Sequence, residues 1–325
     1  MAEEVHDPEA SSPGRAGTLF GLSRAGLIHL LVVYVVWGST YLGIRLAVQG
    51  PDGFPPFWLG AIRMVLGGGG LLALGRLRRV PLRLDARRYG AAAVSGLLLW
   101  VGGNGLVMVA ERHLPSGYAA LVMGGLPIWI SLIGLVVGER LRPVLAVGMA
   151  VGLLGLVLLT RTGLGQVAGG HRILILVLVA ASWCWALGMS FQRWWLPDTD
   201  AAMSSAWQQM FAGGGFLALA ILSREPMPHP GGPALFGAAY LVVMGSWFAF
   251  TSFIMATRLL PMTVVTTYSY VNPLVAVILG AVVLGERVSP GMAAGGVLLL
   301  LGVGAVIQGQ RARGAKGRPR PGRAS

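Results

Sequence analysis

The segment Arg112–Arg140 reads RHLPSGYAALVMGGLPIWISLIGLVVGER, and Arg258–Arg287 reads RLLPMTVVTTYSYVNPLVAVILGAVVLGER. Both begin with Arg-x-Leu-Pro, contain an internal proline and end with Gly-Glu-Arg, at an offset of 146 to 147 positions. Composition bias produces chance matches of glycine, but it does not readily align proline, glutamate and arginine as well. We therefore interpret the chain as two related halves.

The similarity continues on both sides of these segments. The pattern Gly-Gly-Gly-x-Leu-Ala-Leu begins at Gly68 and again at Gly213. Pro143 and Pro290 occupy matching positions at the start of the last apolar stretch of each half. The repeat therefore covers most of the chain.

The composition is that of a membrane protein. The 325 residues are 55% apolar before the 50 glycines are counted, and only 11% are charged. Soluble domains carry about 25% charged residues, so a water-soluble surface cannot be built from this sequence. The single cysteine, Cys184, excludes an intrachain disulfide and a multi-cysteine metal site, and no metal or other cofactor is expected.

Ten apolar stretches have the length that a helix needs to cross a membrane, which is about 20 residues. Each half contains five of them, and because five is odd, the second half enters the membrane from the opposite side. We therefore predict an all-α integral membrane protein with ten transmembrane helices, arranged as two inverted five-helix repeats. The predicted spans are 26–48, 56–75, 90–110, 116–137, 143–160, 173–193, 202–222, 233–257, 261–284 and 290–308.

The repeats are predicted to occupy residues 26–161 and 172–308. Residues 1–25 are interpreted as a disordered cytoplasmic tail, and residues 309–325 as a basic cytoplasmic tail. Inverted repeats suit alternating access, with the substrate site near the midplane where the two halves meet. This architecture favours a transporter over a receptor or a scaffold.

The basic residues predict the orientation. With a cytoplasmic N-terminus, 18 Lys and Arg fall in inner segments and five fall in outer loops. This bias places both termini in the cytoplasm. The net charge of +13 lies in short runs between spans and in the C-terminal tail, so the lipid bilayer, and not a nucleic acid, is the expected partner.

Several motifs resemble one family. They are WGSTYLGIR at Trp37–Arg45, the arginine at Arg63, GNG and AERHLPSGYAAL within Gly103–Leu121, and TYSYVNPLVAVILG at Thr267–Gly280. The chain resembles the EamA-type transporters of the drug/metabolite transporter superfamily over residues 26–308. The resemblance implies ten helices, cytoplasmic termini and export of amino acids or other metabolites. It also implies a central cavity lined mainly by spans 1, 3, 4, 6, 8 and 9, with spans 5 and 10 peripheral.

Polar and aromatic residues within the spans are the candidate substrate-binding residues. Trp37, Thr40 and Tyr41 share one face of the first span, and Tyr268 and Asn272 share a face of the ninth. Pro273 frees a carbonyl one turn earlier, as is common at membrane cavities. Three further candidates are expected at mid-depth: Asn104, Trp183 and Trp247.

Arg63 is the remaining candidate, about 10 Å into the second span at 1.5 Å per residue. An arginine at this depth is costly, and no carboxylate nearby in the sequence compensates it. Two interpretations stay open. The guanidinium could bind helix carbonyls or snorkel outward, or its planar donors could bind a substrate carboxylate.

All twelve acidic residues lie in the tails, in loops or at the ends of spans. Glu111, Glu139 and Glu286 are the ones at span ends. A proton-coupled cation exporter would need an acid within the membrane. No catalytic constellation for an intramembrane enzyme is present, and none is predicted. We therefore predict an inner-membrane exporter of amino acids or similar zwitterions. A nucleotide-sugar or organophosphate exchanger is the alternative, although it would need more cavity arginines or lysines.

Glycines recur at four-residue spacing in the fifth and tenth spans, as at Gly148/Gly152 and Gly291/Gly295. This spacing lets helices approach closely. Packing inside the bundle is the expected use, and a homodimer through the fifth or tenth span stays open.

Overall fold

The computed structural model describes residues 18–19, 22–138, 143–166, 173–196, 200–260, 262–265 and 267–316. These residues form ten helical spans, which confirms the all-α membrane architecture predicted from the sequence. Residues 1–17 and 317–325 of the two predicted tails lie outside the described residues, as do Glu139 and Arg140 of the repeated Gly-Glu-Arg motif.

The first half contains spans one to five. Its elements are α1 (Arg24–Val48); α2 (Pro56–Leu77); α3 (Ala86–Gly96) with the π-helical segment η2 (Leu97–Gly105) and α4 (Leu106–Glu111); α5 (Ser116–Met123) with α6 (Leu126–Val136); and α7 (Pro143–Gln166).

The second half repeats this order. Its elements are α8 (Ile173–Trp195); α9 (Ala201–Leu222); α10 (Gly232–Tyr240) with the π-helical segment η4 (Leu241–Ala249) and α11 (Phe250–Leu259); α12 (Met262–Val265) with α13 (Tyr268–Leu284); and α14 (Pro290–Lys316).

The first and last helices extend beyond the spans expected from hydropathy. Two short antiparallel strands, β1 (Thr18–Leu19) and β2 (Leu22–Ser23), fall within residues 1–25 and precede α1. The Ser23 hydroxyl then accepts a hydrogen bond from the Gly26 amide at 3.2 Å, and this N-cap lets α1 begin at Arg24. At the other end α14 continues to Lys316, since arginine, glutamine and alanine are good helix formers.

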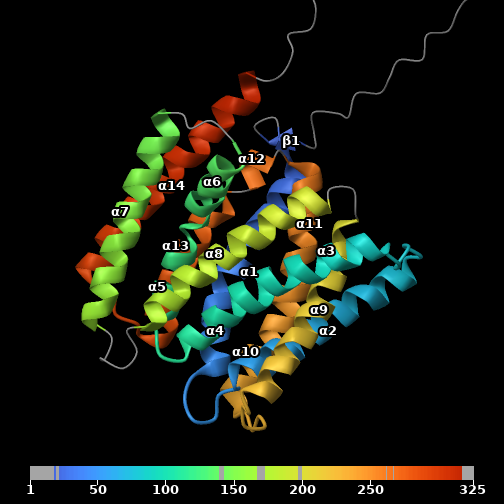
Figure 1. The fold of residues 1–325 in the computed structure, drawn as a ribbon. Coiled ribbons are helices and arrows are strands. Elements are labelled where there is room, and N and C mark those ends of the chain that lie inside the picture. The colour runs from blue at the N-terminus through green and yellow to red at the C-terminus, as the bar shows by residue number, and fades with distance from the viewer. Residues whose placement is uncertain are drawn as a thin grey trace, which may run out of the picture.

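The repeat is visible in the irregular elements and in the packing. The third span of each half contains a nine-residue π-helical segment, η2 or η4. Helices at equivalent positions pair across the halves: α2 packs on α9, and α7 packs on α14. Figure 1 shows α7 and α14 side by side at one edge of the bundle, which is the peripheral position expected for spans five and ten.

Glycines set the close approach of α7 and α14. A Cβ added at Gly302 would overlap the backbone of Gly152, and one added at Gly155 would overlap the backbone of Leu299. The glycine spacing therefore serves packing inside the bundle. A homodimer through these spans stays a prediction.

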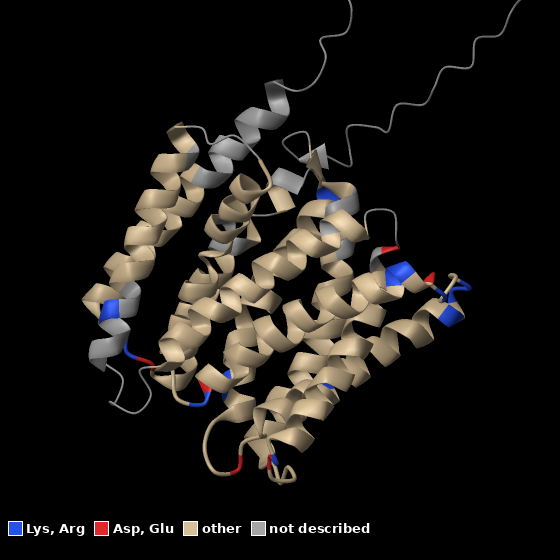
Figure 2. Ribbon diagram, viewed as in Figure 1, with Lys and Arg blue, Asp and Glu red and all other residues tan. Residues whose placement is uncertain are grey.

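The outward faces of the helices are apolar. Exposed side chains such as Leu31 on α1, Leu154 on α7 and Val282 on α13 point away from the bundle. Figure 2 shows the charged residues mainly at helix ends and in connections. Within the described residues, six helical stretches are long and apolar enough to cross a membrane, judged by length and composition alone. Shorter apolar helices accompany them.

Two glycines of α3 give a matched test of this packing. A Cβ at Gly96 would overlap the Gln208 backbone on α9, whereas a Cβ at Gly90 would meet nothing within 4 Å. We expect Gly96→Ala to destabilise the fold by about 1–3 kcal/mol through overpacking. Gly90→Ala should instead stabilise it by about 0.5–1 kcal/mol through helix propensity. Thermal unfolding of both purified variants in detergent checks this, and equal apparent Tm values would contradict the packing.

Candidate functional site

A cavity of about 90 Å³ lies in the middle of the bundle, between elements of both halves. Spans 1, 2, 3, 4, 6 and 9 contribute its walls, close to the set that the resemblance implies. Seven of the candidate residues line it: Trp37, Thr40, Tyr41, Arg63, Asn104, Tyr268 and Asn272. Ile44, Trp100, Val107, Ala120, Met123, Gly124, Leu126, Trp185 and Pro273 complete the lining.

Arg63 is held at the wall of this cavity by neutral partners. Its side chain is 4% exposed, Nη1 donates to Asn104 Oδ1 at 2.9 Å, and Nε donates to Ser246 Oγ at 3.3 Å. Its guanidinium carbon lies 5.7 Å from the centre of the Trp100 ring, a cation–π contact. Gly245 leaves room for Nη2, because an added Cβ would lie 3.3 Å from that atom.

The charge of Arg63 is not balanced by an ion pair with a carboxylate within the described residues. A guanidinium has five N–H donors, and the hydrogen bonds to Asn104 and Ser246 use two of them. The cavity therefore contains a buried cation with donors left for an anionic group.

Aromatic rings at the cavity form two groups. Trp37 contacts Tyr268 edge-on with 5.3 Å between ring centroids, and Trp37 also lies 4.9 Å from Phe253. Trp100 and Trp185 make an edge-to-face pair at 5.7 Å. These rings give the cavity an apolar wall of defined shape, which favours a small organic ligand over a hydrated ion.

The fourth and ninth spans are interrupted beside the cavity. The fourth span breaks at Gly124, where an added Cβ would lie 2.9 Å from the ring of Pro273 on α13. With its amide nitrogen turned toward the backbone, Asn272 donates to the carbonyl oxygens of Tyr268 and Tyr34, at 3.2 Å each. Asn272 thus stabilises the proline-containing start of α13, and in this conformation its amide donors are used by the protein.

Two of the candidate residues lie away from the cavity. Trp183 stacks on Trp129 at 5.0 Å and packs against the core. Trp247 is 39% exposed on the outside of the bundle, and its indole donates to the Leu66 carbonyl at 3.2 Å. The role of these two tryptophans in substrate binding stays a prediction that the geometry does not favour.

Sequence reasoning missed Trp100, Trp185 and Ser246. Trp100 precedes Asn104 by four residues and so shares its face, a signal that was present in the sequence. Trp185 is two residues after Trp183, on nearly the opposite face of an apolar helix, and periodicity alone could not choose between them. Ser246 lies 183 positions from its partner Arg63, and only the folded chain brings them together.

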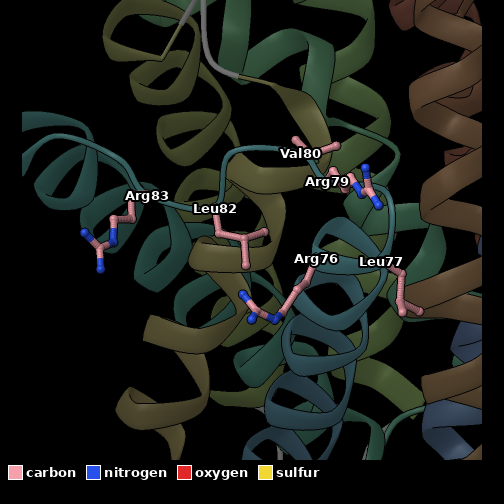
Figure 3. Close-up of a pocket in the computed structure, with 6 residues that line it drawn as sticks. All are labelled: Arg76, Leu77, Arg79, Val80, Leu82 and Arg83. Atoms are coloured by element: carbon pink, nitrogen blue, oxygen red, sulfur yellow. The ribbon is translucent and has the colours of Figure 1, made fainter.

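A second hollow lies at the end of α2 and is lined by arginines, among them Arg76, Arg79 and Arg83. Figure 3 shows their guanidinium groups pointing in different directions and not toward one point. These arginines belong to the basic inner segment expected from the sequence, and the central cavity is the better candidate for a binding site.

The EamA-like transporter family model matches residues 24–161 and 172–308, which are the two halves described above. The chain belongs to the EamA-like transporter family. This membership makes the molecule a membrane transporter of the drug/metabolite transporter superfamily and not an enzyme.

This EamA-like transporter is 34% identical over 263 residues to YedA of Escherichia coli, described as an uncharacterized inner membrane transporter. That match covers 80% of this chain and 83% of YedA. It is also 27% identical over 293 residues to a probable terminal-alkyne amino-acid exporter of Streptantibioticus cattleyicolor, covering 84% of this chain and 90% of the exporter.

A solved structure described only as a crystal structure of a protein has the same fold. It superposes with a TM-score of 0.62 at 23% sequence identity, over 90% of this chain and 99% of the solved chain. At this identity the likeness of the EamA-like transporter to that structure concerns the fold alone.

Proposed function

We propose that this transporter exports small zwitterionic metabolites, amino acids or close analogues, across the inner membrane by alternating access. The observation that carries the proposal is Arg63, a buried guanidinium at the cavity wall with no carboxylate partner among the described residues. A substrate carboxylate supplies the missing negative charge and accepts the remaining donors in the planar geometry that arginine favours.

The size of the cavity and its aromatic walls support a small substrate. Pockets for drug-sized ligands occupy about 300–1,000 Å³, whereas this cavity measures about 90 Å³. A nucleotide sugar would also need several cations for its phosphates, and among the described residues Arg63 is the one arginine or lysine lining the cavity. The relative described as a probable amino-acid exporter is consistent with the same substrate class.

The arginine bias of the connections supports an orientation with both termini in the cytoplasm. With this orientation, the arginines between α2 and α3 face the cytoplasmic leaflet, and the α4–α5 connection faces outward. The inner membrane is the proposed location, as in the name of the YedA relative.

Efflux of labelled amino acids from proteoliposomes tests the proposal. We expect one or a few amino acids to leave down their own gradient, because the remaining donors of Arg63 suit a substrate carboxylate. The same panel is measured with and without an imposed pH gradient, and protein-free liposomes give the leak rate. If no amino acid moves faster than this leak, the zwitterion proposal is wrong.

A further inference from the structure

The last residue of α4, Glu111, is a buried carboxylate at one end of the bundle. Its side chain is 0% exposed, and neither carboxylate oxygen has a hydrogen-bond partner among the residues that the structure describes. A carboxylate that is dry and unpaired is strongly disfavoured in its charged form, so the uncharged acid is the form that this site tolerates.

Glu111 lies one helical turn beyond the cavity. Val107, four residues earlier on α4, lines the cavity, and Ile44 lines it from α1. Continuing outward by one turn on each helix reaches Glu111 and Val48, which are fully buried, and Leu114 beyond them is buried as well. By helix geometry this buried layer lies between the cavity and the end of the bundle where α4 ends.

A cation and an anion lie close to the carboxyl group of Glu111. Arg45 on α1 donates from Nη1 to the backbone carbonyl of Glu111 but makes no ion pair with its carboxylate. Glu286, between α13 and α14, interacts electrostatically with Glu111. Glu286 is fixed by hydrogen bonds from the Ser116 and Gly117 amides at 2.8 and 3.1 Å. An anion at the start of α5 is favoured by the helix dipole.

Among the described residues, the other neighbours add no second cation inside the layer. Tyr41 on α1 interacts electrostatically with Glu111, and Tyr118 lies on α5. Residues 173–181, the first turns of α8, carry no titratable side chain. Arg112 and His113 belong to the same connection as Glu111, and both are exposed.

We propose that Glu111 is a proton-binding site that controls this end of the cavity. The layer stays closed while the carboxyl group carries its proton. When the proton leaves to water on that side, the new negative charge is repelled by Glu286, pairs with Arg45 and draws in water, and the layer opens. The proton returns from the same side, so transport gains a pH dependence without carrying a proton across the membrane.

This proposal takes the cavity to be the transport route and so rests on the proposed function. Its test needs no substrate. The full-length chain carries Cys184→Ser to remove its single cysteine and Val48→Cys to place a thiol in the buried layer. A membrane-impermeant maleimide then labels the purified protein in detergent at a series of pH values from about 5.5 to about 8.5, all above the ordinary pKa of a glutamate.

The reference is the same double variant with Glu111→Gln added. At each pH the labelling rate of the chain with Glu111 is divided by that of the reference, so that the effect of thiol ionisation on the two rates cancels. We expect this ratio to rise about tenfold with pH, since only the chain with Glu111 gains a charge that opens the layer. Adding Glu225→Gln instead should leave the rates unchanged. Glu225 also caps a helix at this end, accepting from the Phe57 and Trp58 amides at 3.1 and 3.2 Å.

A constant ratio across the pH range would overturn the proposal. If Glu111→Gln does not fold, the unfolded Val48→Cys chain becomes the reference, and a matching pH profile in the folded and unfolded chains overturns it equally. Labelling does not depend on substrate. The labelling experiment therefore still tests the role of Glu111 if no amino acid is transported in the efflux assay.

Discussion

Transport at low substrate concentration is expected to fall about 30-fold or more when Arg63 is replaced by methionine. Removing one partner of a buried, hydrogen-bonded charge pair costs about 2 kcal/mol or more, and 1.4 kcal/mol is a factor of ten. Methionine keeps much of the side-chain volume but cannot bind a carboxylate. Initial efflux rates of the identified substrate, measured over a range of concentrations, check this expectation.

Two further variants separate recognition from folding. Arg63→Lys keeps a positive charge but loses the planar fork of donors, so we expect an intermediate loss, seen mainly as a raised KM. Arg76→Met removes an exposed arginine from the same helix and should leave transport unchanged. If Arg63→Met folds with an unaltered Tm and transports at the normal rate, the guanidinium has a structural role and does not bind the substrate.

The second large effect is expected from filling the cavity. Met123 is half-buried and lines the cavity from α5. Met123→Trp introduces a bulky ring beside a space of about 90 Å³. We expect transport to be lost at every substrate concentration, because the obstruction is steric and excess substrate does not relieve it. The effect therefore appears in the maximal rate, unlike the loss in Arg63→Lys.

Met123→Leu is the matched control for this experiment. It is a near volume-conserving change that costs less than about 1.5 kcal/mol, and it should transport normally. Size-exclusion profiles and Tm values of both variants show whether they fold alike. Normal transport by a well-folded Met123→Trp chain would mean that the substrate route runs elsewhere in the bundle.

The repeat itself could be read from the sequence, because its markers are local. Prolines, glycines and Gly-Glu-Arg ends recur at a fixed offset, and each apolar stretch has the length of a membrane span. Helical periodicity also placed Trp37, Thr40 and Tyr41 on one face, and all three line the cavity. These inferences depend only on spacing along one helix, which the sequence contains in full.

The choice between faces of an apolar helix could not be predicted in this way. In a soluble helix the polar side identifies the outside, but lipid tails are as apolar as the protein core. The sequence therefore does not distinguish Trp183, which stacks in the core, from Trp185, which lines the cavity. Trp247 likewise reads as a central aromatic residue but lies on the outside of the bundle.

The sequence alone determined the ten spans, their grouping into two inverted halves and the family to which the chain belongs. Tertiary structure decided which polar groups meet. Arg63 finds Asn104 and Ser246 on other spans, and Glu111, at a span end in the sequence, is enclosed without a hydrogen-bond partner among the described residues. The physical reason is that hydropathy and periodicity act within one helix, whereas the rotation and pairing of helices depend on contacts between residues far apart in the chain.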